Sequence, residues 1–423
     1  MNVTITPSIP EGKIKSIASK SSAHRLLICA ALADKSTEIV CEELNADIEA
    51  TVRCLSALGA KITRKGTSFI VLPIKAPKQN AELDCGESGS TLRFLIPVVA
   101  ALGCGCTFIM SGRLPERPLS PLREELEAHG IEFSGIGTSR LTVSGKLPSG
   151  EYKIRGDVSS QFISGLLFAL SIATGESRII IEGKAESLGY INMTCDALYE
   201  FSADPEKTDD GYIVTGKKKL TSPEKISTEG DWSNAAFALC AGAIVKKAKT
   251  CVYGLDCESS QGDRMIIDLL VRFGADVRRK GDSFTVRRGM LYGMDIDATN
   301  IPDLVPILAV VAAYAEGETR IYGAERLRLK ESDRLATVTK MLTTLGAEII
   351  EAQNGLIIKG GKRLTGGTVS SFGDHRIAMS AAIAALSCES AVTITEAEAV
   401  EKSYPTFWDD LAALGVAISK ENS

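Results

Sequence analysis

The residues of this sequence that could do chemistry are mostly cations that stand beside small polar residues. They occur in short motifs along the whole chain: Lys20 and Arg25, Arg93, Arg117, Lys330 and Arg334, Arg376, and Lys402. Any one of them alone is more often the partner in a surface salt bridge, worth ~0–1 kcal/mol. Together they predict a site for substrates with several negative charges, because arginine forks bind phosphate and carboxylate bidentately and lysine supplies a movable charge.

These cations stand at or near the starts of a helical pattern that the chain repeats. Small polar residues precede an almost entirely apolar stretch in six copies, which begin at Ser21, Gly89, Ser159, Asp231, Asp303 and Asp374, 68 to 72 residues apart. Each copy predicts a buried helix whose N-terminus faces a polar environment. Free amides and the positive end of the helix dipole favour an anion at such a terminus.

A second series of helical patterns ends in glycine and follows the same spacing. Its glycines are Gly59, Gly130, Gly274, Gly346 and Gly415, with a drifted copy at Phe201-Ser202-Ala203. A glycine after the last apolar turn predicts a left-handed C-cap, and alternating strand patterns such as residues 275–286 follow. The sequence therefore predicts a six-fold repeat of a mixed strand and helix unit, an α/β fold.

Composition limits the class of protein. At ~150 residues per domain, 423 residues predict two domains or more. A net charge of −5 disfavours nucleic acid or an anionic membrane as partner. Eleven scattered cysteines favour reduced thiols in a cytoplasmic protein, and Cys104 and Cys106 are interpreted as structural. We predict no signal peptide and no membrane span, since Pro97 and two glycines break the longest apolar run, residues 94–110.

The two ends of the chain predict how the repeats are divided. Residues 3–6 read as a strand with no helix before it, and the last repeat ends at residues 416–419 without a hairpin partner. We expect the first strand to complete the last repeat. That gives a discontinuous lobe of three repeats, 1–19 plus 229–423, and an inserted lobe of three repeats, 20–228, with the substrate cleft between them.

Several motifs, in order and spacing, resemble one known family. The sets SKSSAHR, GESGST, PERPL, VSSQF, NIPDL, LKESDR, GDHR and KSYP are similar to those of the 5-enolpyruvylshikimate-3-phosphate synthases, the 3-phosphoshikimate 1-carboxyvinyltransferases of aromatic amino-acid synthesis. The resemblance implies a two-lobed inside-out α/β barrel of six βαβαββ units. It also implies transfer of the enolpyruvyl group of phosphoenolpyruvate to the 5-hydroxyl of shikimate 3-phosphate, with no metal or cofactor and a monomeric chain.

The resemblance also assigns roles to residues of this sequence. For shikimate 3-phosphate it implies Lys20, Ser21, Arg25, Ser159, Ser160, Gln161, Ser187, Asp303 and Lys330, with Tyr190 against the ring. For phosphoenolpyruvate it implies Lys20, Gly89, Arg117, Gln161, Arg334, Arg376 and Lys402. One departure is Glu87, where many relatives have Asn; a carboxylate there is unfavourable near an anionic substrate or a glyphosate-like inhibitor unless a neighbour such as Arg93 neutralises it.

The chemistry requires a base at the hydroxyl and an acid at the methylene carbon. We assign Asp303 as the base and Glu331 as the acid, with Lys20 able to share the proton transfer. Simpler roles remain open: Glu331 and Asp333 could pair locally with Arg328 or Arg334, and Asp303 could cap a helix after Pro302. Asp333 is not placed in the site.

Two other functions remain as alternatives. A UDP-N-acetylglucosamine enolpyruvyl transferase would share the fold, but it typically carries a reactive cysteine in the loop equivalent to residues 112–118, which has none here. A non-catalytic repeat protein with an anion-binding face would need no placed carboxylates. Because the chain has three histidines, chemistry at a metal or a histidine triad is not expected.

Overall fold

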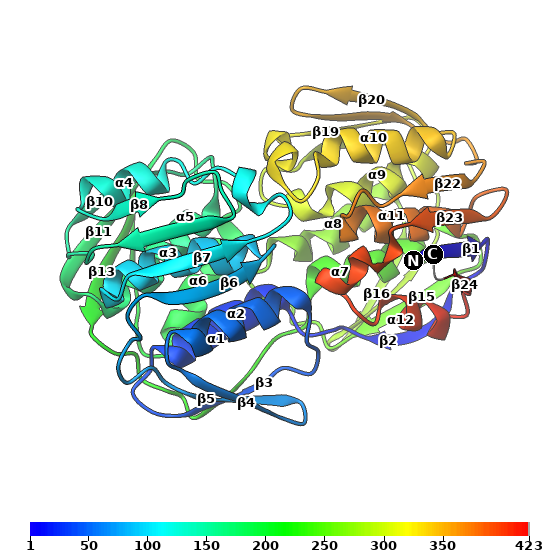
Figure 1. Cartoon of the computed structure of the whole chain (residues 1–423). Coiled ribbons are helices and arrows are strands. Elements are labelled where there is room, and N and C mark those ends of the chain that lie inside the picture. Colours follow the sequence, from blue (N-terminus) through cyan, green and yellow to red (C-terminus); the bar gives the residue numbers. More distant parts are fainter. Residues whose placement is uncertain (422–423) are drawn as a thin grey trace. The chain divides into compact units, whose positions relative to one another are not determined.

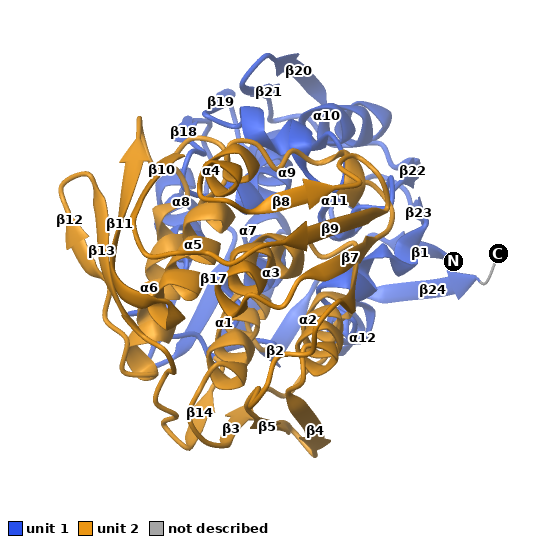
Figure 2. Cartoon of the chain, turned by 60° about the vertical axis from the view of Figure 1, so that its left-hand side comes forward, with its two compact units in different colours: residues 1–17, 229–423 blue, residues 18–228 orange. Residues whose placement is uncertain are grey.

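The computed structural model describes residues 1–421 and divides the chain into two compact units (Figure 2). Unit 1 comprises Met1–Ile17 and the segment from Glu229 onward, and unit 2 comprises Ala18–Thr228. Each unit has its own continuous apolar core. Within residues 1–421, no helix is both long and apolar enough to cross a bilayer.

Unit 2 contains three four-stranded sheets. Their strand orders are β14-β3-β5-β4, β6-β7-β9-β8 and β10-β11-β13-β12. The strands are β3 (Thr37–Val40), β4 (Lys61–Lys65), β5 (Ser68–Leu72), β6 (Ala81–Gly86), β7 (Cys106–Met110), β8 (Glu132–Ser134), β9 (Arg140–Ser144), β10 (Glu151–Arg155), β11 (Thr174–Glu182), β12 (Glu206–Thr208), β13 (Gly211–Lys217) and β14 (Lys225–Ser227).

Unit 1 contains three more sheets of the same design. Their orders are β16-β17-β15-β2, β18-β19-β21-β20 and β22-β23-β1-β24. The strands are β1 (Asn2–Thr6), β2 (Glu11–Lys15), β15 (Lys249–Tyr253), β16 (Asp276–Lys280), β17 (Ser283–Arg287), β18 (Asp295–Asp297), β19 (Glu318–Tyr322), β20 (Glu348–Ala352), β21 (Gly355–Lys359), β22 (Gly367–Ser370), β23 (Val392–Thr395) and β24 (Ala417–Glu421). In all six sheets one pair of strands is parallel and the other two pairs are antiparallel, so the predicted six-fold repeat is confirmed.

The first strand lies where the sequence places it. β1 pairs antiparallel with both β23 and β24, with Val3 opposite Ile394 and Lys420, so the two ends of the described chain share one sheet (Figure 1). Two strands near the crossings between units do not pair with the strand that follows the next helix. β2 precedes the first helix of unit 2 in sequence but pairs with β15 of unit 1. β14 precedes the first helix after the second crossing but pairs with β3 of unit 2.

The inner helices are buried almost all round, as their composition predicts. They are α1 (Lys20–Ala31), α3 (Gly89–Leu102) and α5 (Ser160–Ile172) in unit 2, and α7 (Trp232–Ile244), α9 (Val305–Tyr314) and α11 (His375–Ala385) in unit 1. Every residue of α7, α9 and α11 is buried. A side chain caps five of the six, namely Ser19, Ser88, Ser159, Asp231 and Asp374, each accepting a backbone N–H.

The outer helices bury only one face. They are α2 (Ala46–Ala57), α4 (Leu122–Ala128), α6 (Leu188–Glu200), α8 (Ile266–Phe273), α10 (Arg334–Thr344) and α12 (Phe407–Ala413), together with 3₁₀ turns η1 (Leu114–Glu116), η2 (Gly262–Met265), η3 (Pro302–Leu304), η4 (Glu325–Leu329) and η5 (Ala397–Lys402). The glycines that follow five of these helices have positive φ, and in the drifted copy Ser202 adopts φ 59° instead. The predicted left-handed helix ends are therefore confirmed.

The inner helices α3 and α5 of unit 2 approach each other closely at a glycine. Pro97 lies inside α3 and has no N–H to donate to the Arg93 carbonyl, four residues earlier. Gly165 of α5 faces this carbonyl: a Cβ there would lie 2.5 Å from the Arg93 oxygen and 3.1 Å from Pro97 Cγ. The close approach places the starts of α3 and α5 next to each other.

We expect Gly165→Ala to lower the free energy of unfolding by about 1–3 kcal/mol, because an overpacked core must shift its backbone. Urea unfolding of the purified chain measures this loss. Gly150→Ala is the matched control, since the nearest atom to its Cβ would lie at 3.9 Å. It should change stability by less than about 0.5 kcal/mol, and an equal loss in both variants would contradict the packing argument.

Candidate active site

The start of α1 presents the first pair of cations in unit 2. Lys20 is the first residue of α1, and its Nζ lies 2.9 Å from Asp47 Oδ2. One turn later the buried Arg25 donates to Thr194 Oγ1 at 2.8 Å and to the Tyr190 carbonyl at 2.7 Å. Both acceptors belong to α6, so Arg25 fixes α6 to α1 and leaves Lys20 at the helix terminus.

The start of α5 is tied to the start of α3 by a polar network. Gln161 accepts from Arg93 Nη1 at 2.8 Å and donates to Ser90 Oγ at 2.9 Å. Ser159 caps α5, and its hydroxyl accepts from the Gln161 N–H at 3.3 Å. Ser160, the first residue of α5, is buried. Amides of two helix N-termini and one guanidinium therefore gather in this part of unit 2, which suits an anion.

Two further predicted residues complete the set in unit 2. Arg117 lies directly against Gly89, because a Cβ on Gly89 would be 2.9 Å from Arg117 Nη1. Only a residue without a side chain allows the guanidinium this position. Ser187 precedes α6 and is buried in a left-handed conformation with φ 54°, which is costly for serine.

A chain of hydrogen bonds links three helices in unit 2. His24 Nδ1 lies 2.7 Å from Thr51 Oγ1, which lies 2.7 Å from Thr91 Oγ1, and Thr91 Oγ1 donates to Ser88 Oγ at 2.8 Å. Burial lowers the pKa of His24 to about 3, so its imidazole is neutral at physiological pH. The chain keeps α1, α2 and α3 in fixed register. Sequence analysis missed it, because threonines in an apolar helix carry no distinctive pattern.

In unit 1 the buried Arg334 binds three carboxylates. Its Nε lies 2.8 Å from Asp374 Oδ2, its Nη1 lies 2.9 Å from Asp303 Oδ1, and its Nη2 lies 2.9 Å from Glu331 Oε2. Asp374 also caps α11 and accepts a hydrogen bond from Ser332 at 3.0 Å. The position of Arg334 at the start of α10 thus holds residues from three segments together.

Asp303 is surrounded by cations and does not cap its helix. Besides Arg334, Lys330 Nζ lies 3.6 Å away and Arg376 Nη2 lies 3.4 Å away. Asp303 lies inside η3, and the N-cap positions of η3 and α9 are occupied by Ile301 and Leu304. The alternative role of Asp303 as a helix cap is therefore wrong. Burial would raise the pKa of Asp303, but Arg376, Lys330 and Arg334 hold that pKa well below its usual value.

Glu331 and Asp333 have different partners, as the sequence analysis expected. Glu331 contacts Arg334 and lies 3.8 Å from Lys402 Nζ, next to the cations of the site. Asp333 caps α10 by accepting the Ala336 N–H and pairs with Arg328 at 3.0 Å. The local ion pair proposed for Asp333 is confirmed, and for Glu331 the pair with Arg334 exists within the larger group.

The predicted residues thus fall into two sets. Unit 2 holds Lys20, Ser21, Arg25, Gly89, Arg117, Ser159, Ser160, Gln161, Ser187 and Tyr190, and unit 1 holds Asp303, Lys330, Glu331, Arg334, Arg376 and Lys402. Both sets combine cations with helix N-termini, so each can attract an anion despite the acidic chain. The sequence analysis did not assign site roles to Asp47, Asp263 and Asp374. Their only signal was position, at or near helix starts.

A buried carboxyl group, Asp263, belongs to the surroundings of the set in unit 1. Its Oδ2 accepts the Ser233 hydroxyl, and among the described residues nothing donates a hydrogen bond to its Oδ1. Burial, followed by the charge of Asp303, raises the pKa of Asp263 to about 7. The folded chain therefore keeps a proton on Asp263 that the unfolded chain releases near pH 4.

The sign of this shift gives a pH-dependent prediction. The folded pKa is raised, so Asp263 costs no stability below about pH 4 and costs increasingly more up to about pH 7. Asp263→Asn removes this cost. The difference in unfolding free energy between variant and wild type should favour the variant by roughly 2–4 kcal/mol more at pH 8 than at pH 4. Urea unfolding at both pH values measures it. Asp268→Asn, an exposed position in α8, is the control, and the same pH trend in both variants would overturn the assignment.

Comparisons with known proteins agree with this geometry. The family model described as EPSP synthase (3-phosphoshikimate 1-carboxyvinyltransferase) matches residues 6–411. The 3-phosphoshikimate 1-carboxyvinyltransferases of Clostridium novyi and Clostridium kluyveri are each 41% identical to this chain, over 99% of it and 98% of their own length.

Solved structures share the fold. An EPSP synthase from Acinetobacter baumannii has a TM-score of 0.81 and 26% identity over 99% of this chain and 100% of its own. The enolpyruvyl transferase NikO from Streptomyces tendae has a TM-score of 0.82 at 18% identity, over 100% of this chain and 99% of its own, and shows the fold alone. The expected inside-out α/β architecture is thereby confirmed. A family match across nearly the whole chain, supported by relatives at 41% identity, shows that the chain belongs to the EPSP synthase family.

Proposed function

We propose that this chain transfers the enolpyruvyl group of phosphoenolpyruvate to the 5-hydroxyl of shikimate 3-phosphate and releases inorganic phosphate. Family membership supports the reaction. The observation that carries the proposal is Asp303, a carboxylate kept ionised by Arg334, Arg376 and Lys330 among residues suited to bind anions. A protein that only bound anions would have no need for such a carboxylate.

The set in unit 2 is proposed to bind the phosphate of shikimate 3-phosphate. Ser159, Ser160 and Gln161 stand at the start of α5, where backbone amides add to the side-chain donors. Ser187 and Ser21 are the further hydroxyl donors. Arg25 is proposed to bind shikimate 3-phosphate, and its hydrogen bond to the Tyr190 carbonyl also holds the start of α6 in place. Asp303 and Lys330 are proposed to contact the ring hydroxyls.

Phosphoenolpyruvate is proposed to bind the remaining cations. Arg117 lies against Gly89 in unit 2, and Arg334, Arg376 and Lys402 belong to unit 1. Arg334 already binds three carboxylates, so we expect it to orient Asp303 and Glu331 more than to grip the substrate. Arg376 and Lys402 are then the main ligands of unit 1 for the anionic groups. Lys20 and Gln161 are proposed to lie close to both substrates.

The proton transfers follow from these positions. The Asp303 carboxylate takes the proton of the 5-hydroxyl while Glu331, or Lys20, gives a proton to the methylene carbon. The hydroxyl oxygen bonds to the resulting cationic carbon and forms a tetrahedral adduct. The carbon–oxygen bond to phosphate then breaks, and phosphate leaves with its electron pair and takes the proton held by Asp303. The methyl group returns its proton to the group that donated it. Such acid–base help gives roughly 10²–10⁴-fold, whereas orienting two substrates can supply ~7–11 kcal/mol.

The proposed roles draw on residues of both units. We further propose that the chain acts as a monomer in the cytoplasm. The substrates are small, and every residue with a proposed role belongs to this single chain.

The activity itself can be measured directly. The purified chain, mixed with shikimate 3-phosphate and phosphoenolpyruvate, should release inorganic phosphate without added metal or nucleotide. UDP-N-acetylglucosamine in place of shikimate 3-phosphate should release none. Phosphate release with the sugar nucleotide alone would favour the alternative enolpyruvyl transferase.

Asp303→Asn tests the proposed base. The amide keeps the shape of the side chain but accepts no proton, so turnover should fall by roughly 10²–10⁴-fold. Binding of shikimate 3-phosphate, followed by calorimetry, should persist, because three neighbouring cations remain. Asp333→Asn is the matched control, because Asp333 caps α10 and has no proposed role in the reaction. Asn also caps helices well. If Asp303→Asn kept turnover within about threefold of the control, the base assignment would be wrong.

A further inference from the structure

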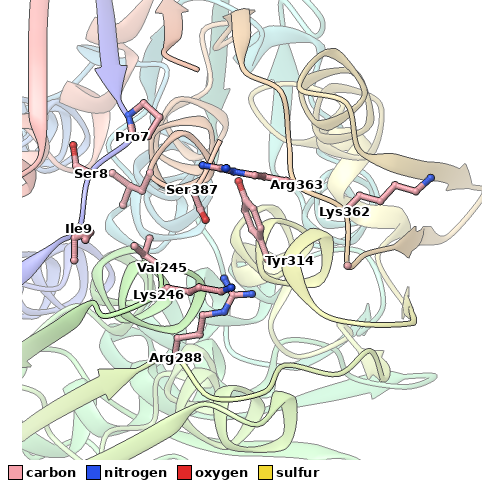
Figure 3. Close-up of a pocket in the computed structure, with 12 residues that line it drawn as sticks. Pro7, Ser8, Ile9, Val245, Lys246, Arg288, Tyr314, Lys362, Arg363 and Ser387 are labelled. Carbon is pink, nitrogen blue, oxygen red and sulfur yellow. The ribbon is translucent and has the colours of Figure 1, made fainter. Parts of the chain in front are cut away.

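Unit 1 contains a polar pocket at the C-terminal ends of its inner helices. The pocket has a volume of about 520 Å³ (Figure 3). Val245 follows α7, Tyr314 ends α9 and Leu386 follows α11, and all three line the pocket. Since α9 has ten residues, about 15 Å of helix separates the pocket from Asp303. The pocket is therefore distinct from the candidate active site.

Cations line this pocket, and no Asp or Glu is among its lining residues. Figure 3 shows the charged ends of Lys246 and Arg288 directed toward each other below Tyr314, and the Arg363 side chain on the other side of the ring. Lys362 points away and lies 3.3 Å from Glu348. Three cations in two groups therefore face the pocket.

Two of these cations already bond backbone carbonyls, one at a helix end and one in the turn after α11. Arg288 donates to the carbonyl of Ile244, the last residue of α7, and Arg363 donates to the Cys388 carbonyl at 3.4 Å. A helix C-terminus carries about −0.5 of a charge, so three of them offset only about half of three cations. Lys246 makes no hydrogen bond or ion pair with any other residue of 1–421. The pocket retains positive charge that helix capping does not use.

The walls of the pocket are held in place and partly apolar. Ser8, in the loop between β1 and β2, donates its N–H to the Leu386 carbonyl at 3.3 Å and accepts the Ala417 N–H at 3.2 Å. The Tyr314 hydroxyl donates to the Ala384 carbonyl at 2.7 Å. Pro7, Ile9 and Val245 add apolar surface. A ligand would thus meet a preformed site with an apolar wall between two groups of cations.

Partial burial of Arg288 favours its binding to an anion. Arg288 is half-buried, and burial lowers its pKa from the usual value for arginine. A desolvated guanidinium forms stronger charge-assisted hydrogen bonds to carboxylates than an exposed one. Arg288 and Arg363 both follow the last strand of a repeat, β17 and β21 respectively, so two repeats bring a cation to the same end of the unit.

We propose that this pocket is a second anion-binding site, which takes a small organic acid with two separate carboxylates. One carboxylate would contact Lys246 and Arg288, and the other would contact Arg363. The carbon framework between them would lie against Tyr314 and the apolar wall. The site does not depend on the reaction proposed above.

Calorimetry with succinate as probe tests the site on the full chain. The double variant Lys246→Gln/Arg363→Gln should bind succinate at least about tenfold more weakly than the wild type, because charge-assisted hydrogen bonds are lost. The double variant Arg279→Gln/Lys280→Gln removes the same charge from exposed positions of β16 and should bind like the wild type. Turnover should be unchanged in both, since neither variant touches the candidate active site.

Two further measurements keep the test decisive. Ser387→Phe fills the pocket and keeps its cations, so it should also lose succinate binding even if the double variant folds poorly. Inorganic phosphate, whose charges sit on one group, should bind the wild-type pocket at least about tenfold more weakly than succinate. Equal succinate binding in the pocket variants and the control, or none by the wild type, would overturn the proposal.

Discussion

The arrangement of unit 1 depends on one buried guanidinium. Arg334 binds Asp303, Glu331 and Asp374, which come from three different segments, and it is almost inaccessible to solvent. A buried cation needs such partners, because an uncompensated charge would cost several kcal/mol. The same contacts fix two carboxylates with proposed proton-transfer roles. Folding and the proposed reaction therefore both require these contacts of Arg334. Neither carboxylate can move without disturbing the other.

Much of the fold could be predicted because local sequence patterns mark each copy of the repeat. Apolar helices with small polar starts and glycines after the outer helices need only local physics to be recognised. Long-range pairing was predictable in one case, β1 with the last repeat, since both ends lacked a partner. The exchange of β2 and β14 near the crossings could not be predicted, because each strand pattern fits either unit equally well.

For the candidate site, the sequence indicated residue types better than it indicated partners. Arg25 and Arg334 were both expected to bind substrate, which stays a prediction, and in this structure their guanidinium groups also contact protein atoms. A sequence shows that an arginine is present, not whether a carbonyl or carboxylate of its own chain reaches it first. The start of α9 differs from the other copies of the repeat. A side chain caps each of the other inner helices, whereas the 3₁₀ turn η3 precedes α9 and Asp303 pairs with its cations.

The pairing of β1 has a consequence for how the chain is made. This strand is synthesised well before its neighbours β23 and β24, which begin at Val392 and Ala417. At typical elongation rates of about 5–20 residues per second, it waits roughly 20–80 s before either neighbour exists. Unit 2, whose strands all lie between residues 37 and 227, can close its sheets long before that. Translation order thus favours completing the inserted unit first, while the apolar face of the N-terminal strand stays exposed to chaperones.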